Sequence, residues 1–182
     1  MINRYNEHYK KENYFGNSYH GLVEFFKEYP KNNYVLDLGC GQGRDSIFLG
    51  RLGYKVLGID VSDVGIKQLN KVAIKENLNV KGIVDDIHEF KITDEIDIVL
   101  MDSIFHFYKR DYENEKKLLL KVITELRQGA ILCNFIMKGK KREADFKRII
   151  EESNIKFEVM VDDYTEYPEY DGKFHMYIIK KQ

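Results

Sequence analysis

The sequence predicts an α/β fold in a single domain. Short apolar runs typical of buried parallel strands alternate with segments whose apolar residues recur at helical spacing. The first run, residues 34–38, leads at once into three glycines, a helical segment and a second apolar run that ends in Asp60. The chain of 182 residues is long enough to bury most of its apolar surface without disulfides or metal ions.

Periodicity and helix-ending residues assign the elements along the chain. Pro30 ends the first helix, Gly53 and Gly129 follow the ends of two others, and Ser62 is a suitable N-cap. The predicted helices span residues 19–29, 44–52, 62–77, 111–127 and 141–153. The predicted strands span residues 34–38, 55–60, 80–84, 96–101, 130–137, 156–162 and 174–180. Because no helix separates the last two strands, they are expected to form an antiparallel hairpin with a long loop.

Composition narrows the class of protein. A formal net charge of −1 gives no general attraction to nucleic acid or membranes, so neither is expected as a partner. The basic segment 138–142 is interpreted as a solvated turn. Cys40 and Cys133 lack the spacing of metal ligands and fit a reduced, cytoplasmic chain. The N-terminus lacks the apolar segment of a signal peptide, and no apolar run approaches the ~18 residues of a membrane span.

The glycine turn after the first strand predicts a nucleoside site. Gly39, Gly41 and Gly43 let the backbone turn tightly and approach a ligand, and the following helix directs free amides towards it. Asp60, at the tip of the next strand, can accept hydrogen bonds from both hydroxyls of a ribose. A dinucleotide fingerprint would place its third glycine at position 44, which is Arg44. This difference weakens the alternative of a nicotinamide-dependent oxidoreductase.

At these residues the chain resembles the class I S-adenosylmethionine-dependent methyltransferases, whose first turn has the pattern acid-x-Gly-x-Gly-x-Gly. Asp37 and the three glycines match that pattern, and residues 41–46 resemble the small methyltransferases of the tellurite-resistance type. The resemblance implies a single Rossmann-like, doubly wound domain with a seven-stranded, mostly parallel sheet. Its last strand would lie antiparallel beside the fifth. The core would span residues 19–182, and residues 1–18 would form an arm that is either loosely packed or a lid over the pocket.

Four strand ends carry glycines or polar residues and are expected to meet at one edge of the sheet, where ligands of such folds bind. The resemblance implies that Gly39 and Gly41 pack against the methionine part of S-adenosylmethionine. Asp37 would brace the turn and reach the methionine amino group through water. Arg44 would either contact the methionine carboxylate or pair with a surface acid. Asp102 would lie near the methionine amino end.

The resemblance also assigns residues to the nucleoside half of the donor. Asp60 would bind the ribose hydroxyls, and Val61 would lie against the adenine face. Asp86 would accept a hydrogen bond from the adenine amino group, with the Ile87 backbone beside the ring. Asp85 is the alternative to Asp86, since a shift of one residue exchanges the two.

One histidine is the candidate for catalysis. His106 closely follows the fourth predicted strand and could take a proton from the acceptor, and the alternative is a packed or solvent-facing side chain. His175, on the last predicted strand, could face the pocket or its back. Methyl transfer can also proceed without a base, through in-line alignment of acceptor, methyl group and sulfur.

The sequence therefore predicts an S-adenosylmethionine-dependent methyltransferase with a small-molecule acceptor. The alternative is a noncatalytic domain that binds S-adenosylmethionine or S-adenosylhomocysteine and acts as a regulator or partner. Residues 102–105 lack the prolines of adenine and glutamine N-methyltransferases, and two distant cysteines are too few for arsenite methylation. Tyr164, Tyr167 and Tyr170, among the acids of a predicted loop over residues 162–171, would suit a cationic amine, and the alternative is an exposed hairpin loop. Neither the acceptor nor the oligomeric state follows from the sequence.

Overall fold

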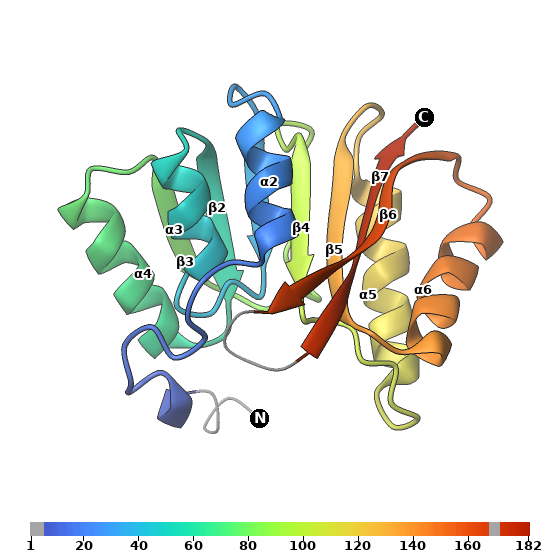
Figure 1. The fold of residues 1–182 in the computed structure, drawn as a ribbon, viewed down its shortest axis with the longest axis horizontal. Helices are drawn as coiled ribbons and strands as arrows, with labels where there is room; N and C mark the ends of the chain where they lie inside the picture. Colours follow the sequence, from blue (N-terminus) through green and yellow to red (C-terminus); the bar gives the residue numbers. More distant parts are fainter. Residues whose placement is uncertain (1–5, 168–171) are drawn as a thin grey trace.

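In the computed structural model, which describes residues 6–167 and 172–182, the chain forms a seven-stranded sheet (Figure 1). The strand order is β3-β2-β1-β4-β5-β7-β6, and β7 runs antiparallel to both β5 and β6 whereas the other neighbours are parallel. The strands are β1 (Tyr34–Leu38), β2 (Lys55–Asp60), β3 (Val80–Val84), β4 (Ile98–Asp102), β5 (Ile131–Met137), β6 (Phe157–Tyr167) and β7 (Gly172–Lys181). The predicted α/β sheet of seven strands, with an antiparallel last strand beside the fifth, is confirmed.

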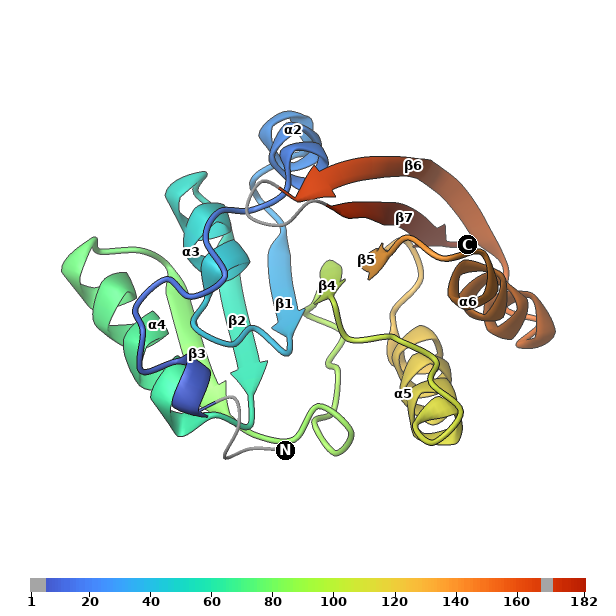
Figure 2. The same cartoon turned by 60° about the horizontal axis from the view of Figure 1, so that its bottom comes forward.

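Helices cover both faces of the sheet. One face carries α2 (His20–Glu28), α3 (Arg44–Arg51) and α4 (Asp63–Lys75), and the other carries α5 (Tyr112–Glu125) and α6 (Lys140–Glu152) (Figures 1 and 2). Each of these helices begins and ends within two residues of its predicted limits. In the part of the chain that the structure describes, no helix has the length and apolar character needed to cross a membrane.

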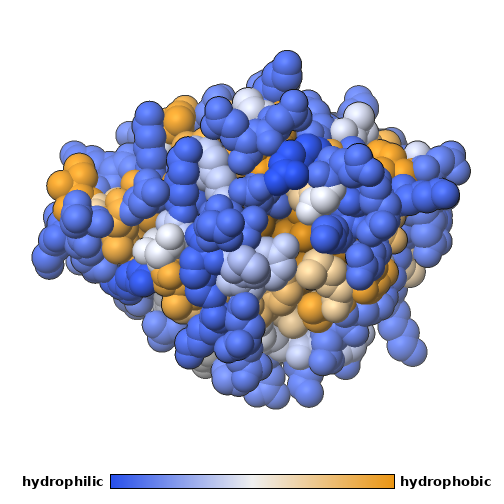
Figure 3. Space-filling model, turned by 90° about the horizontal axis from the view of Figure 1, so that it is seen from above, coloured by the Kyte–Doolittle hydropathy of each residue, from blue (hydrophilic) through white to orange (hydrophobic). Residues whose placement is uncertain are grey.

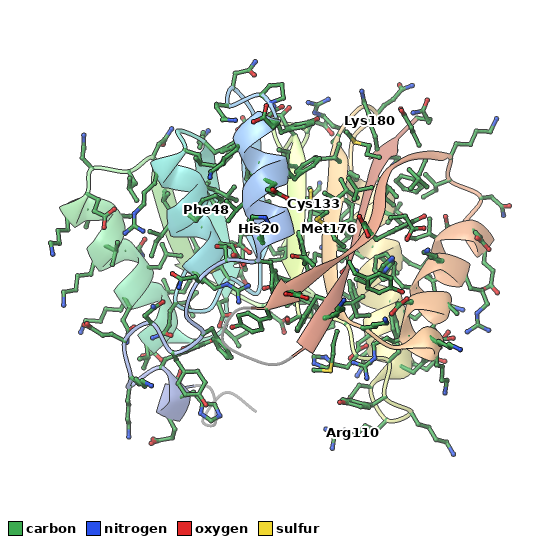
Figure 4. All side chains as sticks on the ribbon, viewed as in Figure 1. His20, Phe48, Arg110, Cys133, Met176 and Lys180 are labelled. Atoms are coloured by element: carbon green, nitrogen blue, oxygen red, sulfur yellow. The ribbon has the colours of Figure 1, made fainter. Side chains whose placement is uncertain are left out.

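Each face of the sheet buries its own apolar cluster. Cys133 and Phe135 of β5 belong to the cluster under α2 and α3, whereas Leu132 and Ile136 belong to the cluster under α5 and α6. This alternation follows from the pleat, which directs successive side chains to opposite faces. Cys133 lies near the middle of the sheet (Figure 4), and it and Cys40 are both free.

The C-terminal hairpin differs from its prediction. The predicted loop over residues 162–171 is wrong as far as Tyr167, where β6 ends, and residues 168–171 lie outside the described residues. β6 is an edge strand with mostly exposed side chains, so it contains many polar residues and its composition resembles that of a loop. The Thr165 hydroxyl accepts a hydrogen bond from the backbone N–H of Gly21 at 2.9 Å, which ties this part of β6 to α2.

The strand order reverses between β1 and β4. Leu38 of β1 pairs with Ile59 of β2 and with Met101 of β4, so the residues that follow these strands lie at one edge of the sheet. Figure 2 brings this edge forward. In open parallel sheets such a reversal is where ligands bind. The opposite edge, seen from above in Figure 3, is mostly hydrophilic, with apolar patches between the polar side chains.

Candidate functional site

A cavity of about 1700 Å³ lies at the carboxyl edge of the strands. Its wall includes the glycine turn, the ends of β2 and β4, the N-terminal arm and the loop before α5, from which Arg110 projects at the bottom of Figure 4. The predicted site residues on this wall are Asp37, Gly39, Gly41, Arg44, Asp60, Val61, Ile87, Asp102 and His106. The structure therefore brings together every predicted site residue except Asp86.

Asp86 lies on the turn after β3 and away from the cavity wall. Its exposed carboxylate accepts a hydrogen bond from the backbone N–H of His88 at 2.9 Å. Asp85 is also exposed and accepts from the N–H of Asp86 at 2.7 Å. Both acids cap a turn because β3 already ends at Val84. Ile87 and His88 do line the cavity, so an adenine contact by Asp86 or Asp85 stays a prediction.

The turn after β1 requires glycine at three positions. Gly39, Gly41 and Gly43 have φ angles of 77°, 54° and 81°, in the left-handed region that other residues rarely adopt. A side chain at Gly39 would also meet Ile104, whose Cδ1 lies 2.3 Å from the ideal Cβ position. The backbone N–H of Gly41 donates to Asp60 Oδ2 at 2.9 Å. The acid at the end of β2 therefore holds the glycine turn in place.

Asp60 keeps acceptor capacity for a ligand. Its Oδ1 accepts from the backbone N–H of Ser62 at 2.8 Å, and its Oδ2 accepts from Gly41. Burial raises the pKa of Asp60, and the two backbone hydrogen bonds oppose that rise. A carboxylate offers about four acceptor sites, so two backbone donors leave room for hydroxyls. Beside it, Val61 is 37% exposed and presents an apolar surface to the cavity.

The wall around the glycine turn is acidic. Burial, together with the charge of Asp45, raises the pKa of Asp37 to about 7, although Ser46 Oγ donates to Asp37 Oδ2 at 2.6 Å. Arg44 is a mostly buried cation of this region, and the carboxylates around it are Asp37, Asp45, Asp60 and Asp102. This excess of negative charge suits a ligand that carries positive charge, such as a sulfonium with an ammonium group.

Arg44 pairs with the buried Asp45 and the partly buried Asp102. Its Nη2 donates to Asp45 Oδ2 at 2.8 Å and forms an ion pair with Asp102. Its Cζ lies 4.7 Å from the ring centroid of Tyr19 and 5.2 Å from that of Tyr167. Tyr19 was not predicted from the sequence, and Tyr167 was predicted only as part of an amine site, because no spacing or motif connects either tyrosine with the glycine turn.

The N-terminal arm covers the glycine turn. Tyr9 is 4% exposed, and its hydroxyl oxygen lies 2.5 Å from where a Cβ of Gly41 would stand. Gln42, inside the turn, accepts a hydrogen bond from the backbone N–H of Tyr14 at 3.0 Å. The arm from residue 6 onward thus packs against the glycine turn, and its role as a lid stays a prediction. Gln42 has no signal of its own in the sequence beyond its place between two glycines.

His106 lies on the cavity wall, whereas His175 does not. The backbone N–H of His106 donates to Glu115 Oε2 at 2.9 Å, and its ring stacks on that of Tyr108 with centroids 5.5 Å apart. The His106 side chain is partly exposed, so a ligand in the cavity can reach it. His175 is buried, with its Nε2 2.7 Å from Asp162 Oδ1.

The tyrosines and acids of the last hairpin do not form one cluster in the cavity. The Tyr164 hydroxyl donates to Glu143 Oε2 of α6 at 2.7 Å, and Asp162 pairs with a lysine of α6 at 2.6 Å. Neither Tyr164 nor Asp162 lines the cavity, whereas Tyr167 does. Tyr170 lies outside the described residues. The part of the hairpin that the structure describes therefore gives no cage for an amine.

A family model, curated relatives and a solved structure all match the TehB family. The family model described as "Tellurite resistance protein TehB" matches residues 1–135. The "Probable S-adenosyl-L-methionine-dependent methyltransferase TehB" of Haemophilus influenzae (strain 10810) is 38% identical over 107 residues, which are 56% of this chain and 37% of that protein. The chain thus spans little more than a third of the length of this curated relative.

Solved structures share the fold. TehB from Haemophilus influenzae superposes with a TM-score of 0.69 and 23% identity, over 94% of this chain and 67% of that one. Magnesium protoporphyrin IX methyltransferase (ChlM) from Synechocystis PCC 6803 with bound SAM gives a TM-score of 0.73 and 17% identity, over 89% of this chain and 77% of that one. The family match over residues 1–135 confirms the resemblance predicted from the glycine turn, and the chain belongs to the TehB family of class I S-adenosylmethionine-dependent methyltransferases.

Proposed function

We propose that this protein transfers the methyl group of S-adenosylmethionine to a small-molecule acceptor. The observation that carries the proposal is the cavity at the reversal between β1 and β4, where Asp60 closes the glycine turn beside an excess of carboxylates. Family membership supports the donor, since the TehB proteins of Haemophilus influenzae are named as S-adenosyl-L-methionine-dependent methyltransferases. The donor supplies an activated methyl group on a sulfonium that leaves as a neutral thioether.

The residues around the glycine turn would hold the donor. Asp60 offers free acceptor sites for the ribose hydroxyls, and Val61 offers an apolar surface for the adenine ring. Gly39 and Gly41 allow the methionine part to approach the backbone without a clash. Asp102, and Asp37 where the pH exceeds its pKa of about 7, would place negative charge near the cationic end of the donor.

The rest of the cavity would receive the acceptor. A volume of about 1700 Å³ exceeds the roughly 300–1,000 Å³ of most single-ligand sites, which supports a second small molecule beside the donor. His106, Tyr108 and Met137 lie on this part of the wall, and Tyr108 and Met137 are about half exposed. His106 would take the proton that an acceptor loses on methylation, and in-line alignment of acceptor and methyl group supplies the rest of the rate.

Product formation tests the proposal directly. The protein would be incubated with S-adenosylmethionine and a panel of thiols, amines, phenols, selenite and tellurite, the last because of the family's description. Mass spectrometry would follow S-adenosylhomocysteine and the methylated product. Formation of both with one acceptor class is the expected result. If S-adenosylmethionine binds in calorimetry but no acceptor yields product, the noncatalytic alternative is supported, and absence of binding contradicts the donor assignment.

Two substitutions separate donor binding from acceptor chemistry. Asp60→Ala should weaken S-adenosylhomocysteine binding by about 1–3 kcal/mol, the range for leaving polar partners unpaired. Asp94→Ala is the matched control, because Asp94 is exposed and lies before β4, at the opposite edge of the sheet. His106→Asn should leave that affinity unchanged and lower kcat by about 10²–10⁴ if it acts as the base. Equal loss of affinity in the Asp94 variant would contradict the role of Asp60.

A further inference from the structure

Arg44 is held in one orientation by four other side chains. Its Cζ packs 4.7 Å and 5.2 Å from the ring centroids of Tyr19 and Tyr167. Its Nε and Nη2 donate to the two carboxylate oxygens of Asp45 at 3.1 Å and 2.8 Å, and Nη2 also pairs with Asp102. The side chain is 13% exposed. Two-pronged carboxylate pairing and cation–π contacts fix both the position and the direction of a guanidinium.

Asp102 is in turn oriented by donors from separate parts of the chain. Its Oδ2 pairs with Arg44 of α3, and its Oδ1 accepts from Tyr19 Oη at 2.8 Å and from Ser103 Oγ at 3.0 Å. Burial raises the pKa of Tyr19, so its hydroxyl keeps the proton that it donates. Ser103 has a φ of 57°, which non-glycine residues rarely adopt. The end of β4 is therefore held in an unusual conformation by a network centred on Asp102.

Asp102 keeps acceptor capacity for a ligand's cation at the end of β4. Arg44 and Asp102 both line the cavity, with side chains 13% and 10% exposed, but Arg44 directs its Nε and Nη2 at carboxylates of the protein. An ionised carboxylate that receives three donors has about one acceptor site left. That remaining site has a direction fixed by Arg44 and Tyr19, as binding of an ammonium group requires.

We propose that Arg44 is a positioning residue of the donor site. It fixes the carboxylate of Asp102 for the amino group of S-adenosylmethionine and does not itself bind the methionine carboxylate. The inference rests on the proposed function, because it concerns the same donor site. It replaces the direct contact that the resemblance allowed with an indirect role that passes through Asp102.

Four thioethers of adenosine separate the direct from the indirect role. S-Adenosylhomocysteine carries both the amino group and the carboxylate, one analogue lacks only the carboxylate, one lacks only the amino group, and 5′-methylthioadenosine lacks both. Their affinities would be measured by calorimetry with the wild-type protein and with Arg44→Met, Arg44→Lys and Tyr19→Phe. Arg148→Met is the matched control, because Arg148 pairs with Asp145 and does not line the cavity.

The expected pattern depends on the amino group. Arg44→Met should weaken the two ligands that carry an amino group by the same factor, about tenfold, and the two that lack it by less than about twofold. Arg44→Lys should recover part of this loss, since it keeps the charge but not the two-pronged geometry. Tyr19→Phe keeps the ring and should show the same pattern with a smaller factor, about threefold. This conservative variant keeps the test available if Arg44→Met does not fold.

Three results would overturn the inference. Loss confined to the two ligands with a carboxylate would mean that Arg44 binds that group directly. Equal loss for all four ligands would mean a merely structural role. An unchanged preference for the amino group in both the Arg44 and Tyr19 variants would mean that Asp102 does not depend on them. If the wild-type protein binds none of the four thioethers, the proposed function fails first, so the two failures are distinguishable.

Discussion

Asp37 should make the protein less stable as the pH rises. Asp37 is 3% exposed at the end of β1, and burial raises the pKa of its carboxyl group from 3.8 to about 7, helped by the nearby charge of Asp45. Ser46 Oγ donates to Asp37 Oδ2 at 2.6 Å, and an asparagine oxygen could accept the same hydrogen bond. Asp37→Asn therefore removes the titration with little change of shape.

The size of the effect follows from proton linkage. Below pH 3.8 the group is protonated in both states, and between pH 3.8 and about 7 only the unfolded chain loses the proton. Folding stability then falls by about 1.4 kcal/mol for each pH unit, and above pH 7 the full penalty of roughly 4 kcal/mol persists. Between pH 5 and pH 8 the difference in unfolding free energy between Asp37→Asn and the wild type should grow by about 2.5 kcal/mol in favour of the variant.

Thermal and urea denaturation at pH 5 and pH 8 would measure this difference. For a domain of this size, about 2.5 kcal/mol corresponds to a relative shift in Tm of roughly 5–10 °C. Because the unfolding free energy of the wild type is subtracted from that of the variant at each pH, the contributions of other titrating groups cancel. A difference that stays constant between the two pH values would refute the raised pKa, and a difference that grows in favour of the wild type would refute the sign of the linkage.

The donor's positive charge should lower the pKa of Asp37, so binding near pH 7 should release up to about half a proton. Calorimetry in buffers of different ionisation enthalpy should show that the observed binding enthalpy of the wild type varies linearly with the ionisation enthalpy of the buffer, and that this dependence is absent in Asp37→Asn. A binding enthalpy of the wild type that does not depend on the buffer would contradict the prediction. A second substitution, Val80→Ala, should restore the stability of the alanine variant of Gly50 but not that of Gly53. Gly50→Ala places Cβ 2.3 Å from Val80 Cγ2 and should cost about 1–3 kcal/mol, and Val80→Ala should recover most of this. In Gly53→Ala the new Cβ meets no atom within 4 Å, but the backbone φ is 97°, so the variant should lose about 1–2 kcal/mol of unfolding free energy. Combining it with Val80→Ala should not recover this loss, and urea denaturation would measure both variants.

Much of the fold could be predicted because local signals agreed with tertiary packing. The helix of residues 20–28 ends just before Pro30, the helix of residues 63–75 begins after its N-cap Ser62, and the apolar spacing of both matches their buried faces. The hairpin was the exception. As an edge strand, residues 157–167 bury few side chains, so apolar alternation is weak where Thr165 and Tyr167 pack inward. Burial of that kind depends on α2, which lies far away in the sequence.

The candidate site was predictable to the extent that it is local. Gly39, Gly41 and Asp60 belong to one strand–turn–helix–strand unit, and their spacing alone indicates a nucleoside site. The hydrogen bond from Tyr19 to Asp102 joins residues 83 positions apart, and no periodic pattern encodes such a contact. The same limit applies to Tyr9 of the arm, whose position against Gly41 depends on how the arm folds back.

The place of β7 between β5 and β6 has a consequence for how the chain folds during synthesis. β5 pairs with β7 over seven residues, from Ile131 to Met137, yet β7 is made after both α6 and β6. Until residue 181 has left the ribosome, β5 therefore remains an unpaired edge with a row of free backbone donors and acceptors. A pause in translation within this interval would expose that edge to other nascent chains, so aggregation should respond to slow codons between β5 and β7 more than to slow codons before β4.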